Sequence, residues 1–130
     1  MHDLTERIGT AVLLISHNLG VVREFSDRVY VIYRGNMAEH GTTAQLFHEP
    51  RHPYTRALLR CLPTVDRERR PLVEIGGQPP DLARLPAGCP FAPRCPEREA
   101  VCEREYPPAV AIGDGHVAHC WAAARVGAPA

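Results

Sequence analysis

The sequence predicts an α/β fold, and two observations support this prediction. The segment Thr10–Ser16 is a short, nearly continuous apolar run with β-branched residues, which is typical of a parallel strand buried on both faces. The 130-residue chain also changes in composition near residues 50–61, because all 13 prolines lie at Pro50 or later and all five cysteines at Cys61 or later. We therefore expect regular structure before this boundary and an irregular, cysteine- and proline-rich extension after it.

The first expected elements surround the buried strand. Residues 3–8 (DLTERI) resemble the last turns of a helix, and Gly9 would end it. After the strand, residues 18–26 (NLGVVREFS) carry apolar side chains at helical spacing. Asn18 is a residue type that caps helix N-termini, so a second short helix is expected there.

A hairpin and two helices complete the expected regular part. Residues 28–33 (RVYVIY) alternate as a strand does, and residues 37–40 (MAEH) are expected to pair back with them. Thr42 and Gln45 form a capping-box pattern for the next helix, and Pro53 lies in the first turn of the last one. One parallel strand and a hairpin cannot cover both faces of a sheet. This series of helices and strands therefore predicts the tail of a larger α/β domain.

Charge and composition exclude several function classes. The 15 basic residues balance 15 acidic ones, so a nucleic-acid partner is not expected. All the basic residues are arginine, and the missing lysine excludes a P-loop and Schiff-base chemistry within this sequence. The longest apolar run, residues 11–15, is far shorter than the ~20 residues that span a bilayer. With no signal peptide at the N-terminus, a soluble, cytoplasmic protein is expected.

The late cysteines are candidate metal ligands: Cys89, Cys95, Cys102 and Cys120. Their spacing, C-x5-C-x6-C-x17-C, lacks the close cysteine pairs of structural zinc sites, whereas iron–sulfur clusters take four thiolates from loops. A reducing compartment also favours ligands over disulfides. From spacing alone, an iron–sulfur cluster, zinc and no metal all stay open. His116 and His119 are nearby alternative ligands, and Cys61 is expected to be a buried or half-buried thiol.

His17 is a second candidate site residue. It follows the predicted buried strand and precedes a helix, which is where open α/β sheets bind ligands and where helix N–H groups attract anions. A histidine there can donate a hydrogen bond to a phosphate oxygen. From its position alone, a structural histidine and a ligand contact both stay open.

The stretch from VLLISHNLG to HPYTRALL resembles the C-terminal part of the nucleotide-binding domain of ABC transporters, in particular the oligopeptide and dipeptide importer branch. In that family a histidine of the switch segment contacts the γ-phosphate of ATP, and His17 matches it, although Asn18 replaces the more usual aspartate. The segments PAGCPFAPRCPEREAVC and HVAHCW resemble the family's C-terminal extension, in which some members hold a four-iron four-sulfur cluster. All four cysteine positions of that extension have a match.

The resemblance implies the C-terminal portion of a P-loop NTPase domain over residues 1–60 and the importer extension over residues 61–130. It implies ATP with Mg²⁺ for the longer parent. The family's Walker A, signature and Walker B motifs precede the switch and are missing from this sequence, so the chain alone is expected neither to bind ATP tightly nor to hydrolyse it.

The partners implied are a second ATP-binding subunit, membrane-spanning permease subunits and a peptide delivered by a separate binding protein. The implied location is the inner face of the cell membrane, reached through the permease subunits. Two alternatives remain from the sequence: a stand-alone metal- or cluster-binding interaction module, and a nucleotide-independent regulatory protein.

Overall fold

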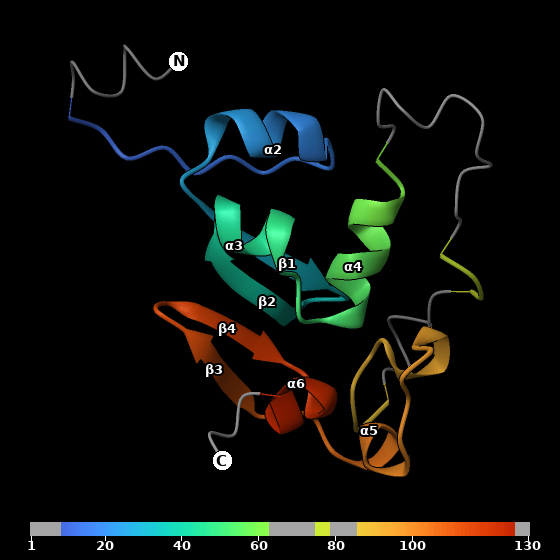
Figure 1. The fold of residues 1–130 in the computed structure, drawn as a ribbon. Helices are drawn as coiled ribbons and strands as arrows, with labels where there is room; N and C mark the ends of the chain where they lie inside the picture. The colour runs from blue at the N-terminus through green and yellow to red at the C-terminus, as the bar shows by residue number, and fades with distance from the viewer. Residues whose placement is uncertain (1–8, 63–74, 79–85, 127–130) are drawn as a thin grey trace.

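The computed structural model describes residues 9–62, 75–78 and 86–126 (Figure 1). The elements follow in the order α2 (Leu19–Phe25), β1 (Arg28–Tyr33), β2 (Asn36–Thr42), α3 (Thr43–His48), α4 (Pro53–Arg60), the 3-10 helix η3 (Ala92–Arg94), α5 (Ala100–Arg104), β3 (Ala109–Gly113), β4 (His116–His119) and α6 (Trp121–Val126). The predicted helix over residues 3–8 lies outside the described residues. Within the described ranges, no helix is both long and apolar enough to cross a membrane.

A four-stranded antiparallel sheet connects the two parts of the chain, with strand order β1-β2-β4-β3. β1 and β2 form the predicted hairpin, and their turn places Arg34 and Gly35 at positive φ, as two-residue hairpin loops require. β3 and β4 form a second hairpin, and Figure 1 shows it beside the first. β2 and β4 join the hairpins through the pairs Glu39↔Ala118 and His40↔Val117. The α/β class is therefore confirmed, with a sheet that crosses the compositional boundary.

The parallel strand expected over Thr10–Ser16 is wrong. These residues form no strand, and Leu13 and Ile15 are 86% and 89% exposed. A parallel strand needs a parallel neighbour, and the described strands pair only in antiparallel fashion. Within the described part of this chain, the apolar run therefore has no neighbouring strand with which to pair.

The expectation of irregular structure after the boundary is wrong in part. The described residues there form η3, α5, the β3–β4 hairpin and α6. β3 and β4 are only five and four residues long, too short for a periodic pattern to be recognised. They form strands because β4 pairs with β2, which supplies the hydrogen-bond partners that the local sequence does not predict.

The predicted helix starts are confirmed. The Asn18 side chain accepts from the backbone N–H groups of Gly20 and Val21 at 3.0 and 3.3 Å. At α3, Gln45 N donates to Thr42 Oγ1 at 3.2 Å, and the Gln45 side chain accepts from Thr42 N at 2.8 Å. Both arrangements satisfy N–H groups that have no partner inside the helix. α4 begins with a proline, as predicted.

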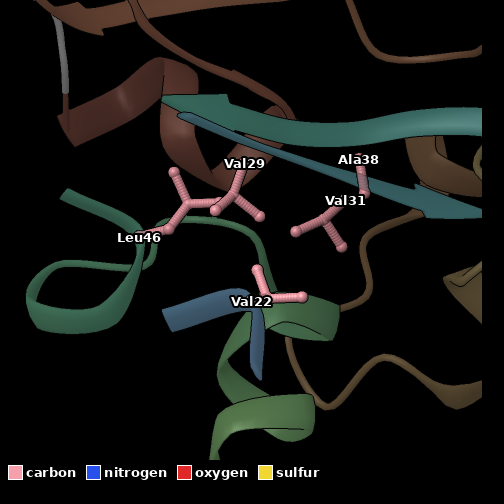
Figure 2. Packing of buried hydrophobic residues seen from close by; sticks show 5 residues of the cluster. All are labelled: Val22, Val29, Val31, Ala38 and Leu46. Carbon is pink, nitrogen blue, oxygen red and sulfur yellow. The ribbon is translucent and has the colours of Figure 1, made fainter. Parts of the chain in front are cut away.

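Two apolar clusters pack against the sheet. The first contains Val22, Val29, Val31, Ala38 and Leu46, whose side chains gather between α2, α3 and the β1–β2 hairpin in Figure 2. The second contains Ala118, Cys120 and Ala123. We call them the valine cluster and the alanine cluster. The valine cluster packs against the first hairpin, and the alanine cluster lies in the region of the late cysteines and includes Cys120.

Candidate four-cysteine site

The four late cysteines line one small cavity, called the cysteine cavity below. Cys89 and Cys95 lie on either side of η3, Cys102 lies in α5, and Cys120 lies between β4 and α6. The cavity has a volume of about 20 Å³, enough for one water-sized occupant. Its other lining residues include His52, Phe91, Glu97, Pro107 and Trp121. The structure thus brings together all four cysteines that the sequence predicts as ligands.

A close backbone approach holds two of these cysteines together. Cys89 N donates to Cys102 O at 2.8 Å. Gly88 makes this contact possible, because a Cβ atom on it would lie 2.7 Å from the carbonyl carbon of Glu103 and closer still to Cys102 O. Turns then carry the chain from Cys89 through η3 to Cys95, where Ala92 N donates to Cys89 O at 3.0 Å and Cys95 N to Ala92 O at 3.2 Å.

Three of the cavity thiols, those of Cys89, Cys95 and Cys120, are held in their neutral form. Burial raises the pKa of Cys95 to about 11 and also raises the pKa values of Cys89 and Cys120. The neighbouring thiols add to this effect, because a negative charge on one sulfur disfavours a charge on the next. Four thiolates would therefore need a cation among them to coexist.

Backbone N–H groups lower the pKa values of the same three thiols and so oppose the effect of burial. The N–H groups of Phe91 and Ala92 lower the pKa of Cys89, and that of Glu97 lowers the pKa of Cys95. At Cys120 the N–H groups of Ala122 and Ala123 have the same effect on the pKa. A sulfur that accepts backbone N–H groups is suited to carry negative charge as a ligand.

No ready-made site for a single ion is present in the described residues. Within the described ranges, no three side chains of His, Cys, Asp or Glu lie close enough to hold one metal ion. None of the five cysteines, all of which the structure describes, forms a disulfide. The four late cysteines thus share a cavity without forming a single-ion site. Cys61 is half-buried, as predicted, and its thiol donates to Ala57 O at 3.3 Å.

The other predicted site residues lie elsewhere. His17 is exposed in the segment before α2 and does not line the cysteine cavity. Neither His116 nor His119 lines it. His116 is buried and pairs with Glu39, and the ring of His119 lies 5.9 Å from that of Tyr106 between centroids. These two alternative ligands therefore have other contacts.

Sequence reasoning missed a buried carboxylate that connects the cavity to the sheet. Glu39 on β2 is fully buried, and its Oε1 lies 2.7 Å from His116 Nε2 on β4. Oε1 also accepts from Arg51 N at 2.7 Å, and Oε2 accepts from His52 N at 3.0 Å. All these contacts offset the cost of burying the carboxylate. The buried positions of β2 are Ala38, Glu39 and Gly41, which do not alternate and so gave no signal for Glu39, and its partner His116 is 77 residues away.

Sequence reasoning also missed His52, which lines the cavity and caps α4. Its Nδ1 accepts from Tyr54 N at 3.0 Å, and its ring lies 6.0 Å from that of Phe91 between centroids. Phe91 in turn contacts Tyr33 and Tyr54, at centroid distances of 5.3 Å each. The position of His52 directly before Pro53 was the only local signal that this residue caps a helix.

Comparison with known proteins places the chain in a family. The family model described as "Oligopeptide/dipeptide transporter, C-terminal region" matches residues 38–102, which is half of the chain. The dipeptide transport ATP-binding protein DppD of Bacillus subtilis is 46% identical over 119 residues, covering 92% of this chain and 36% of that protein. The oligopeptide transport ATP-binding protein OppD of Salmonella typhimurium is 40% identical over 121 residues, covering 93% and 36%.

OppD of Haemophilus influenzae is 39% identical over 125 residues, covering 96% of this chain and 38% of that protein. The chain thus spans little more than a third of the length of these curated relatives. The family match includes three of the four late cysteines and ends at Cys102. The chain belongs to the oligopeptide/dipeptide transporter C-terminal-region family.

Proposed function

We propose that the chain acts as the C-terminal part of the ATP-binding subunit of a bacterial peptide importer. The observation that carries this proposal is the match to transport ATP-binding proteins over 92–96% of the chain. The complete subunit would bind ATP with Mg²⁺ and couple its hydrolysis to peptide uptake. Its partners would be a second ATP-binding subunit, permease subunits in the membrane and a separate peptide-binding protein. It would work on the inner face of the membrane, with residues 1–60 in the nucleotide-binding domain and residues 61–130 as the extension.

In this proposal His17 is the residue that meets the γ-phosphate of ATP. Its exposure before α2 supports this role, because its imidazole is not engaged in a buried structural contact. This sequence contains neither the loop that binds the phosphates of ATP nor the carboxylates that bind the metal. In this proposal His17 therefore acts on ATP that is bound by other parts of the complete subunit. It would contribute one hydrogen bond to the phosphate at the moment of hydrolysis.

A chimera tests this function. The matching region of the Bacillus subtilis DppD would be replaced by this chain, and ATP hydrolysis and dipeptide uptake would be measured in cells and in membranes. We expect the chimera to keep both activities and to lose at least tenfold in ATPase rate on His17→Ala. His48→Ala, at an exposed histidine at the end of α3, is the matched control and should change neither. A His17→Ala chimera as active as the unmodified one would contradict the role of His17.

We also propose that the cysteine cavity holds a four-iron four-sulfur cluster. The donor set fits the group, since four thiols line one cavity and backbone N–H groups are directed at three of the sulfurs. The cavity, with its volume of about 20 Å³, would have to widen to admit the cluster. When bound, the cluster would supply folding free energy to a region with a small apolar core.

Anaerobic purification tests the cluster. We expect a brown protein with absorbance near 400 nm and with iron and sulfide in equal amounts. Cys95→Ser should remove most of the colour, whereas Cys61→Ser, at the half-buried thiol of the α4 C-cap, should leave it unchanged. A colourless protein with one zinc per chain would defeat the cluster and leave a zinc site in its place.

A further inference from the structure

His52 combines burial with a fixed pattern of hydrogen bonding. It is 3% exposed and caps α4, where its Nδ1 accepts the backbone N–H of Tyr54 at 3.0 Å. A neutral imidazole whose Nδ1 accepts a hydrogen bond carries its proton on Nε2. The other polar group of the ring is therefore an N–H donor at Nε2.

The fold holds this ring against the cysteine cavity. Glu39 Oε2 accepts from the backbone N–H of His52, and the ring of Phe91 lies 6.0 Å away between centroids. His52 and Phe91 both line the cavity, together with the four late cysteines. The acceptors on the cavity wall include sulfur atoms and the Glu97 side chain. A neutral thiol is a weak hydrogen-bond acceptor and a thiolate is a much better one. The Nε2–H group of His52 therefore has its best acceptor when a metal centre in the cavity binds the cysteines as thiolates.

We propose that His52 is a hydrogen-bond donor to the centre of the four-cysteine site, with its Nε2–H directed at a ligand sulfur. This inference rests on the proposed cluster and adds a fifth residue to its site. A hydrogen bond to a sulfur stabilises the more negative, reduced state of a cluster and so raises its reduction potential. Because Glu39 holds His52 and also pairs with His116, the donor is tied to the sheet that joins the two hairpins.

Two replacements of His52 separate the donor from the helix cap. His52→Asn keeps both a capping oxygen and an N–H donor, whereas His52→Gly is tolerated at the N-cap of α4 and has no side-chain donor. The midpoint potential of the cluster would be measured by redox titration followed by electron paramagnetic resonance. We expect the highest potential in the wild type, an intermediate one in His52→Asn and the lowest in His52→Gly. His48→Asn, at an exposed histidine, is the control and should match the wild type.

The outcomes distinguish this inference from the proposed cluster. Equal potentials in the wild type and in His52→Gly would overturn the role of His52 while leaving the cluster in place. A wild-type protein without iron and sulfide would overturn the cluster and this inference together. Nitrogen-15 NMR of the histidine rings in the metal-free chain adds an independent test, because a proton on Nδ1 of His52 would contradict the donor. Helix content by circular dichroism should be equal in all variants.

Discussion

The valine and alanine clusters differ in what holds them together. The valine cluster buries branched side chains, each contributing about 1.5–3 kcal/mol on burial. The alanine cluster buries two alanines and a cysteine, which remove much less apolar surface from water. The comparison shows that the first hairpin is stabilised by its own apolar core. The cysteine-bearing region is held instead by the packing of Phe91 against Tyr33 and Tyr54 and by polar contacts with that hairpin.

The polar contacts between the two regions are specific. Besides the Glu39–His116 pair, they include Arg28 Nη2 to Gly115 O at 2.9 Å, Gln45 Nε2 to Asp114 O at 3.2 Å, Tyr106 OH to Met37 O at 2.6 Å and Arg94 Nη1 to Tyr33 OH at 3.2 Å. The first three of these involve an exposed group, and such hydrogen bonds contribute about 0.5–1.5 kcal/mol each. Glu39 is buried, so its contacts should dominate the coupling between the regions.

The largest expected effect is therefore at Glu39. Glu39→Ala leaves a buried histidine and two backbone N–H groups without their acceptor, and we expect a loss of about 3–5 kcal/mol in the free energy of unfolding. Urea unfolding followed by circular dichroism measures it. Glu49→Ala, at an exposed carboxylate that pairs with Arg51, should cost less than about 1 kcal/mol. Similar losses in the two variants would show that Glu39 does not couple the regions.

The next effect tests the valine cluster. Leu46 is 1% exposed, and Leu46→Ala should lower the free energy of unfolding by about 2–5 kcal/mol because it leaves a cavity. Leu13→Ala, at a leucine that is 86% exposed, is the matched control and should have little effect. If the loss at Leu46 were as small as at Leu13, the valine cluster would not be the core of the first hairpin.

The pH dependence of stability tests the surroundings of His52. Its pKa is lowered from 6.5 to about 4 in the folded state, so the unfolded chain binds the proton more readily. The contribution of the neutral ring is fully present above pH 6.5 and is lost as the pH falls through about 4. In metal-free protein, the wild type should lose roughly 2–3 kcal/mol more than His52→Asn between pH 7 and pH 4. Parallel curves for the two proteins would mean that His52 is not buried as a neutral ring.

A smaller effect tests the close approach beside Cys89. Gly88→Ala places a methyl group against the backbone of Cys102 and Glu103, and we expect a loss of about 1–3 kcal/mol together with a lower iron content. Gly76→Ala is the matched control, because a Cβ atom there meets nothing within 4 Å. An unchanged iron content in Gly88→Ala would show that the contact between Cys89 and Cys102 does not shape the site.

Local signals predicted much of the first region. The Thr42–Gln45 capping box, the Asn18 cap and the alternation of residues 28–33 each act within a few residues, so the sequence reveals them directly. The strand expected over Thr10–Ser16 failed because a strand is stable only with a neighbour, and its own composition does not supply one. The β3–β4 hairpin was missed for the converse reason: a weak local pattern becomes a strand because β2 is beside it.

By itself, the sequence determined the α/β class, the first hairpin, the helix caps, the resemblance to peptide importers and the four cysteines as candidate ligands. Only the tertiary structure decided that these cysteines line one cavity, that His52 borders it and that Glu39 joins it to the sheet. The physical reason is distance along the chain. Caps and turns depend on neighbouring residues, whereas Glu39 and His116 meet across 77 positions through packing that no local pattern encodes.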